Sequence, residues 1–481
     1  MKTHWITLIA LLLFGLSAPV VWADELGDLA DDSDNETTQE VSAELSDSDD
    51  LSADLDQDVD DMLDGEADEE EADDPGLKIS IGGYIKMLGY WNREEYSDQL
   101  WGMLQNYPTQ PPAQDISGFN NVGTRLQLKL EGYLGNRARL FTAFNINYNA
   151  ANSIHDGTTA ADKSRQNGDV RMVEAFVEIY ETSRIWKIGP QLVTWSYLEG
   201  MEVPTDRVNA RDKSYKSTEY EDTKLPSTGV LLTQNIGDSQ LEIMAIPVAK
   251  TNIGKEFQDH LFPGTETPRD NTPNQTKWAT RFSSTVGKLD YAVSYVEGLD
   301  PDTDLNAAGN GRAYNRIKSP GLDLQYSLSS WLAKLSYVQT QTEDEDGDNP
   351  LIKNSWQKVA IGGEFTVAVS TINLYAGQHQ IADYKTDAAA QRTNFPLGQL
   401  RERTDFISGH VNANFLTGNA LNLVLMAANH WDEDGETVQT LVRTTFKYKI
   451  ADGLELLVSP TYMDMMDNRF TDFQTEVKYS F

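Results

Sequence analysis

Residues 79–90 read ISIGGYIKMLGY, and two kinds of residue alternate along this stretch. Ile85 and Met87 fall on one side of an extended chain. Tyr84 and Lys86 fall on the other side, because successive side chains of a β-strand point to opposite faces. A period of two with one apolar and one polar side predicts a strand whose two faces meet different surroundings.

The same alternation recurs from this stretch to the end of the chain. It predicts about eighteen strands, each close to the ten or so residues that a tilted transmembrane strand needs. Two of the segments, 276–286 and 453–463, alternate weakly, so about sixteen strands is the alternative. The segments are 78–91, 122–134, 138–149, 170–181, 184–194, 226–236, 239–248, 276–286, 288–298, 317–328, 331–341, 353–366, 369–380, 404–417, 420–430, 437–449, 453–463 and 471–481.

The connections between these segments differ in length on the two sides of the predicted sheet. Short turns such as Gly135-Asn136 and Gly287 alternate with long polar loops such as 150–169 and 195–225. Outer-membrane barrels have short turns in the periplasm and long loops outside, whereas a soluble β-sandwich does not sort its loops in this way. We therefore expect an all-β fold, a transmembrane antiparallel β-barrel, with both termini in the periplasm.

The last strand carries a second signal for the outer membrane. Phe473, Val477, Tyr479 and Phe481 alternate with polar residues, and the chain ends on Phe481. This end resembles the terminal-strand signal that the barrel assembly machinery reads, with Tyr479 and Phe481 as the signal residues. A soluble strand that ends the chain by coincidence is the alternative. We expect a protein of the Gram-negative outer membrane, in contact with lipid and lipopolysaccharide, and a homotrimer is compatible with this interpretation.

Three regions of different composition divide the chain. Residues 1–23 are interpreted as a secretory signal peptide, because Lys2 precedes an apolar run that is too short to span a membrane. Residues 24–76 are expected to form an acidic periplasmic segment, disordered or helical, with 25 acidic residues and no Lys or Arg. The barrel is expected to take residues 77–481, which carry −12 of the net charge of −36.

Composition and motifs exclude several classes of function. The chain has no Cys, which removes thiol catalysis and Cys-ligated metals. Its pI of about 4.4 argues against nucleic-acid binding, and its mean hydropathy of −0.49 argues against a helical membrane bundle. The sequence holds no HExxH, GxSxG or phosphate-loop motif, and Asp61 stands where a calcium loop needs Gly. We expect no catalytic residue, no metal and no cofactor.

A barrel of about eighteen strands is too wide for its side chains to fill, so an inward-folded loop is expected to narrow it. The candidate is loop 195–225, whose interleaved acids and bases would set a transverse field across a pore. An exposed charged loop is the alternative. A modest basic excess on the wall predicts mild preference for anions such as dicarboxylates. The pore-lining or constriction candidates are Lys86, Arg125, Lys129, Glu131, Arg139, Glu174, Lys187, Glu199, Asp206, Arg207, Arg211, Arg443 and Lys447.

One part of the chain adds a resemblance to a known family. Residues 186–195 read WKIGPQLVTW, residues 204–212 read PTDRVNARD and residues 245–248 read AIPV. They resemble a porin-like family of proteobacterial outer-membrane channels, in which a GRQ…W strand end leads into an NPxD…xRD loop. Alginate-export-type eighteen-stranded channels are more distantly similar. Pro190 replaces the Arg of that motif, so one pore Arg that the family has is missing.

Together these patterns predict an outer-membrane porin or diffusion channel for small polar solutes. A non-conducting adhesin or structural barrel of the same membrane is the alternative, because the strand pattern alone does not require that solutes pass.

Overall fold

The fold was described from a computed structural model of the chain. The structure describes residues 77–95, 115–149, 168–199, 203–212, 223–252, 276–302, 304–305, 312–385, 399, 401–416, 420–465 and 468–481. The expected signal peptide (1–23) and acidic segment (24–76) lie outside the described residues.

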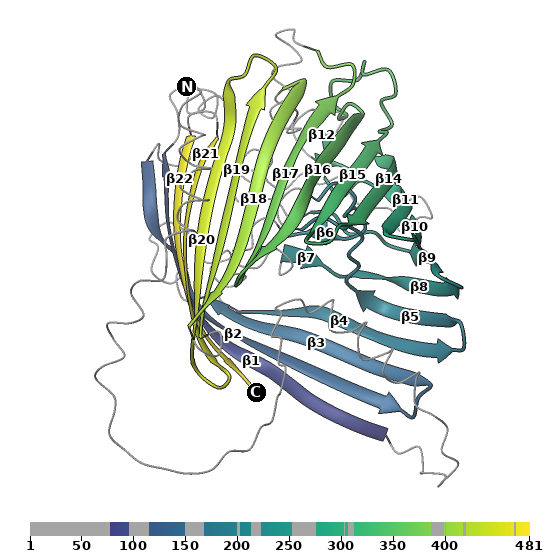
Figure 1. Ribbon diagram of the computed structural model, residues 1–481, viewed down its shortest axis with the longest axis vertical. Helices are drawn as coiled ribbons and strands as arrows, with labels where there is room; N and C mark the ends of the chain where they lie inside the picture. Colours follow the sequence, from purple (N-terminus) through teal and green to yellow (C-terminus); the bar gives the residue numbers. More distant parts are fainter. Residues whose placement is uncertain are drawn as a thin grey trace. The chain divides into compact units, whose positions relative to one another are not determined.

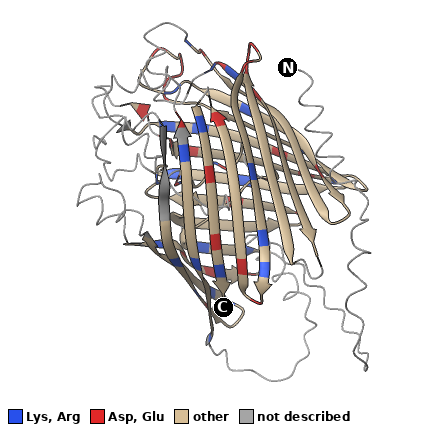
Figure 2. Cartoon of the chain, turned by 90° about the vertical axis from the view of Figure 1, so that its left-hand side faces the viewer, with Lys and Arg blue, Asp and Glu red and all other residues tan. Residues whose placement is uncertain are grey.

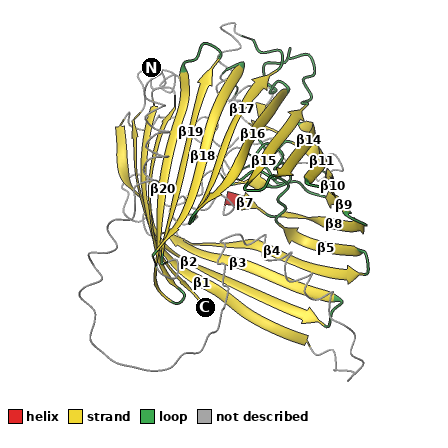
Figure 3. Cartoon of the chain, viewed as in Figure 1, coloured by secondary structure: helices red, strands yellow, loops and turns green. Residues whose placement is uncertain are grey.

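Eighteen strands form one antiparallel sheet (Figures 1 and 3). Each strand pairs with its neighbour along the chain, and the first strand also pairs with the last, so the sheet closes into a barrel. The strands are β1 (Leu77–Glu95), β2 (Asp115–Leu134), β3 (Ala138–Asn149), β4 (Gly168–Glu181), β5 (Arg184–Gln191), β8 (Ser227–Ile236), β9 (Ser239–Ile246), β10 (Lys277–Val286), β11 (Leu289–Leu299), β14 (Arg316–Ser327), β15 (Trp331–Thr340), β16 (Trp356–Val367), β17 (Ser370–Ile381), β18 (Arg403–Phe415), β19 (Leu421–Asp432), β20 (Thr437–Ala451), β21 (Leu454–Met465) and β22 (Asn468–Ser480).

The expected closed barrel is therefore confirmed. The two weakly alternating segments form β10 and β21, so the alternative of sixteen strands is wrong. Two small hairpins outside the barrel sheet complete the described strands: β6 (Ala210–Arg211) pairs with β7 (Lys224–Leu225), and β12 (Asp304–Leu305) pairs with β13 (Arg312–Ala313). Among the described residues, no helix is long and apolar enough to cross a bilayer.

The two faces of the barrel have opposite chemistry. On β1, Ile81 and Met87 are 70% and 61% exposed, whereas Lys86 between them is 1% exposed. The same contrast holds on β2, where Leu130 is exposed and Arg125 is buried. An apolar exterior and a polar interior are stable only when lipid surrounds the barrel, because water would solvate the opposite arrangement. The described barrel is thus a transmembrane barrel, and the closed sheet satisfies the backbone hydrogen bonds within the bilayer.

The seam between β1 and β22 fixes the closure. The Gly83 amide donates to the Phe481 carbonyl at 3.1 Å, and the Phe481 amide donates back to the Gly83 carbonyl at 3.0 Å. Gly83 has a φ of 153°, and a Cβ there would lie 2.1 Å from the carbonyl oxygen of Gln127. Only glycine fits this close approach, so the glycine lets the first strand pair on both sides.

The described parts of the long connection between β5 and β8 pack against the inner side of the barrel wall. We call residues 192–226 the inward segment; the structure describes its parts 192–199, 203–212 and 223–226. Trp195 and Val208 of this segment are buried with Met244, Ile246 and Val296, which belong to strands β9 and β11. This apolar contact anchors the segment to the inner side of the wall, because burial of these side chains removes apolar area from water.

Candidate functional site

The base of the inward segment is held by one buried amide side chain. Asn209 Nδ2 donates to the carbonyl oxygens of Gln191 at 3.2 Å and Leu225 at 2.9 Å, and to Ser227 Oγ at 3.2 Å. Its Oδ1 accepts from the Val193 amide at 2.8 Å. Asn209 therefore joins the end of β5, the start of β8 and the middle of the segment.

The middle of the segment reaches strands that lie well beyond β5 and β8. Thr205 Oγ1 donates to Asp323 Oδ1 of β14 at 3.0 Å and lies 3.4 Å from Ser336 Oγ of β15. The same hydroxyl lies 2.9 Å from the Trp195 carbonyl oxygen, within the segment. Asp323 and Ser336 face each other in the strand register and are both buried. The segment thus lies against the inner surface of the wall from β8 to β15.

Two basic residues, one on the wall and one on the segment, connect the centre of the segment to the wall. Lys277 Nζ, on β10, donates to the carbonyl oxygens of Arg207 at 2.7 Å and Val208 at 3.0 Å. The Arg207 guanidinium lies 3.7 Å from the Asp300 carboxylate and 5.0 Å from the ring centroid of Trp356 on β16. Ammonium–carbonyl and guanidinium–ring contacts of this kind fix a backbone that has no sheet partner.

Asp300 connects the inward segment to the outer loops. Lys353, in the loop between β15 and β16, places its ammonium 3.0 Å from Asp300 and 3.7 Å from Asp304, and donates to the Asp302 carbonyl at 2.6 Å. Burial lowers the pKa of Lys353, but the carboxylates of Asp300 and Asp304 outweigh burial and raise that pKa above its usual value. Burial raises the pKa of Asp304 against the effect of Lys353. This buried ion cluster ties two outer loops to Arg207.

The acidic members of the predicted site all have partners in the structure. Glu174 on β4 accepts from the Leu192 amide at 2.8 Å, and Glu199 accepts from Asn373 Nδ2 on β17 at 3.4 Å. Asp206 binds Arg211 at 2.6 Å and Lys224 at 3.1 Å. Glu131 on β2 accepts from Arg139 at 2.5 Å. Among the acids of the inward segment named here, Asp206 therefore has its charge compensated locally by Arg211 and Lys224.

The basic candidates other than Arg207 and Arg211 lie on the inner face of the wall. Lys86 lies 2.9 Å from Glu476, and Arg139 bridges Glu131 and Glu178. Lys187 lies 3.7 Å from Glu178 and 3.9 Å from the ring centroid of Phe176. Two further cations bond to neutral groups: Arg125 Nε donates to Asn147 at 2.7 Å, and Arg443 Nε donates to Thr461 at 3.1 Å. Lys129 and Lys447 are half-buried on the same face, opposite Gly82 and Asn422 in the strand register.

The structure thus brings the predicted residues together as two groups. Glu199, Asp206, Arg207 and Arg211 belong to the inward segment, and Glu174 reaches the segment from β4. The other candidates lie on strands β1–β5 and β20. Figure 2 shows Lys and Arg interleaved with Asp and Glu along the strands of the barrel. Tyr479 and Phe481 point outward and are 50% and 52% exposed.

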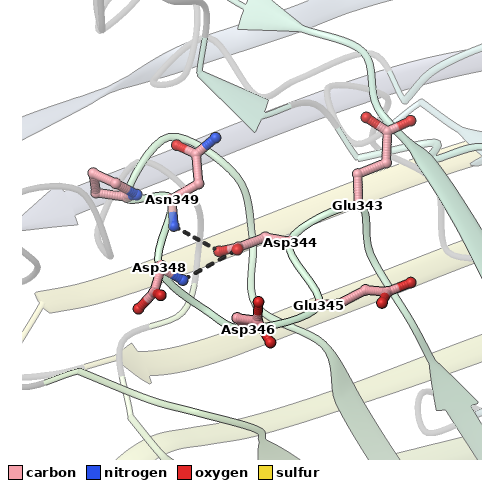
Figure 4. A pocket seen from close by; sticks show the side chains of 7 residues that line it. Glu343, Asp344, Glu345, Asp346, Asp348 and Asn349 are labelled. Carbon is pink, nitrogen blue, oxygen red and sulfur yellow. Dashed lines mark hydrogen bonds between the residues drawn. The ribbon is translucent and has the colours of Figure 1, made fainter.

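The loop between β15 and β16 is strongly acidic. Residues 343–346 and 348–350 of this loop line a pocket in which Asp344 accepts from the amides of Asp348 at 3.1 Å and Asn349 at 3.0 Å (Figure 4). Lys385 pairs with Asp348. The carboxylate of Asp344 therefore shapes the loop itself. Within the described ranges, no group of three or more His, Asp or Glu residues could hold a metal ion.

Sequence patterns did not indicate three of the buried residues that hold the segment. Thr205 and Asn209 carry no charge, and Lys277 lies on a strand whose alternation is weak, so none of the three is among the predicted candidates. The one signal available was local: Thr205 and Asn209 belong to the stretch 204–212 on which the family resemblance rests.

The fold and its inward segment define a transmembrane β-barrel of the outer-membrane type. No protein-family model matches the chain, and no curated protein matches its sequence. Solved structures do match its fold. Acinetobacter baumannii OccAB4 aligns with a TM-score of 0.50 and 10% identity, over 84% of this chain and 98% of that one. Pseudomonas aeruginosa OccK1 (OpdK) aligns with a TM-score of 0.52 and 9% identity, over 84% and 98%.

These similarities confirm the resemblance to porin-like channels at the level of the fold. P. aeruginosa OpdK is described as an outer membrane protein, and it aligns here with a TM-score of 0.51. An eighteen-stranded barrel with an apolar exterior belongs in the outer membrane of a Gram-negative cell, where closed barrels satisfy their backbone within lipid.

Proposed function

We propose that the chain is an outer-membrane diffusion channel for small polar solutes, with mild preference for anions such as dicarboxylates, and that the inward segment constricts it. The observation that carries this proposal is the course of the inward segment. It contacts inward-facing side chains on β14, β15, β16 and β17 although its ends lie on β5 and β8. A segment that lines half of the inner wall reduces the free cross-section of the barrel.

The anion preference is supported by the wall that the described part of the segment does not contact. Strands β20, β22, β1 and β2 place Arg443, Lys447, Lys478, Arg125 and Lys129 on the inner face, in addition to Lys86, which Glu476 compensates. Arg125 Nε donates to the neutral side chain of Asn147, and Arg443 Nε donates to the neutral side chain of Thr461. Positive charge along one wall raises the local concentration of anions.

Two findings on other proteins agree with this proposal. OccAB4 and OpdK share the fold, and one P. aeruginosa OpdK structure of the same fold contains vanillate, which is a carboxylate anion.

The test is reversal potential in a planar bilayer with a salt gradient. We expect a conducting channel with a permeability ratio modestly above unity for chloride over potassium. Arg443→Gln and Lys447→Gln are expected to lower this ratio, whereas Lys449→Gln, at the periplasmic end of the same strand, is the control. Clear cation selectivity of the wild-type channel refutes the anion preference.

The role of the inward segment is tested separately. Replacing residues 196–207 with a short Gly-Ser linker is expected to increase conductance, because the contacts of Thr205 and Arg207 with the far wall are lost. Unchanged conductance in a folded barrel contradicts a constriction.

Liposome swelling with small sugars and dicarboxylates provides the third measurement: if no solute permeates, the barrel is not a channel.

A further inference from the structure

Three histidines lie on adjacent strands of the inner wall. His379 is on β17, His410 on β18 and His430 on β19, and all three are partly accessible. His410 is opposite the buried Asn373 in the strand register, and His430 is opposite the buried Phe406, so both share the inward face. We call these three residues the histidine strip.

Each histidine adjoins a wall residue that the inward segment contacts. The His379 ring lies edge-on to the Trp356 ring, with ring centroids 5.2 Å apart. The Arg207 guanidinium lies 5.0 Å from the centroid of the same Trp356 ring. The His430 ring lies 5.7 Å from that of Phe406, which is buried in one cluster with Leu198.

The third histidine follows the same pattern. His410 is opposite Asn373, whose amide donates to Glu199 of the inward segment at 3.4 Å. The histidine strip therefore follows the edge along which the segment rests on the far wall. A group at this edge borders the narrowest passage if the segment constricts the channel.

Charged groups face the strip from the neighbouring strands. Lys358 on β16 is opposite His379 in the register, and its Nζ lies 5.3 Å from the Phe406 ring centroid. Asp432, two residues beyond His430 on β19, binds Arg401 at 3.0 Å.

Around His410 the charges are mixed. Glu364 is opposite Asn373 and pairs with Lys334 at 2.7 Å, and Arg443 is opposite Met426, the β19 neighbour of His410. From the inward segment, Glu199 and Arg207 approach the strip through the contacts described above. Of the nearby acids, Asp432 pairs with Arg401 and Glu364 pairs with Lys334. A proton on an imidazole therefore adds net positive charge.

We propose that the histidine strip determines the charge specificity of the channel and makes its anion preference depend on pH. This inference rests on the proposed function, because it concerns the same passage. A free imidazole is neutral above about pH 6.5 and carries one positive charge below it. Carboxylates stay ionised down to about pH 4, so between about pH 5 and pH 8 the imidazoles are the side chains that ordinarily change charge.

The sign and size of the effect follow from electrostatics. As the pH falls, the strip gains positive charge, and the permeability ratio of anion to cation rises. One unit charge about 8 Å from a passing ion, in water, changes the local concentration of that ion roughly twofold. Positive charge on the strip therefore raises the anion-to-cation ratio severalfold, and salt near 0.1 M keeps the Debye length at about 10 Å, so that screening does not remove the effect.

The experiment measures reversal potentials of the full mature chain in a potassium chloride gradient at about pH 8 and about pH 5. The wild type is expected to show an anion-to-cation ratio severalfold higher at the lower pH. The triple variant His379→Gln, His410→Gln, His430→Gln is expected to keep its pH 8 ratio at both pH values. Gln378→His, which adds an imidazole to the outward face one residue before His379, is the matched control and should behave as wild type.

Folding of each variant is checked first by heat-modifiable migration on a gel. If the triple variant does not fold, the double variant His379→Gln, His430→Gln takes its place. A wild-type channel that conducts with the same ratio at both pH values overturns the inference and leaves the proposed function standing. A severalfold pH dependence that persists in the histidine variants also overturns it. A barrel that folds but passes no current refutes the proposed function itself.

Discussion

At the scale of single residues, the described interior of the barrel depends in part on polar side chains that charge and strand alternation do not identify. Charge and strand face selected Lys86, Arg125 and Arg139, and each of these side chains is buried on the inner face. Thr205 and Asn209 carry no charge and lie on no strand, so alternation contains no information about them. Their importance arises from partners that are far away in the sequence, such as Asp323, 118 residues from Thr205.

The first prediction concerns Asn209. Asn209→Ala removes the side-chain bonds to Gln191, Leu225, Ser227 and Val193, and leaves buried backbone groups without a partner. Each unpaired buried group costs about 1–3 kcal/mol, so the inward segment should loosen while the strand ladder stays intact. Single-channel recording should show larger and noisier currents, with unchanged heat-modifiable migration. Asn136→Ala, in the exposed turn after β2, is the control. Quiet currents of wild-type size from Asn209→Ala would exclude this role.

At the scale of elements, the strands could be predicted and the inward segment only in part. Alternation is a local property that lipid outside and water inside impose on every membrane strand, so all eighteen expected segments recur as strands. The weakly alternating 276–286 carries Lys277 and Arg281 on its inner face, and Trp278 and Phe282 on its outer face. Its polar Ser and Thr residues weakened the signal because hydroxyl groups occur on both faces.

The second prediction concerns the last strand. Phe481 is 52% exposed, and the bonds that close the seam with Gly83 use its backbone, so Phe481→Ala should leave the closed barrel stable. If the assembly machinery reads the terminal ring, this variant should accumulate severalfold less in the outer membrane yet refold normally in detergent. Phe415→Ala, which truncates an outward ring of 37% exposure at the same end of β18, is the control. Equal membrane levels of the two variants would show that the ring is not an assembly signal.

At the scale of the whole molecule, the closure of the barrel predicts which part of the chain is sufficient to fold. Pairing of β1 begins at Leu77 with β2 and at Tyr84 with β22, so the complete hydrogen-bonded ring lies within residues 77–481.

Deleting residues 24–74 removes 25 acidic side chains and none of the barrel strands. With the leader kept, the shortened chain should reach the outer membrane, migrate as a heat-modifiable barrel and conduct. At about 1 M salt, where the Debye length is about 3 Å, its selectivity should equal that of the full chain. Failure of the shortened chain to form a heat-modifiable barrel would show that residues 24–74 take part in folding, and the division at residue 77 would then be wrong.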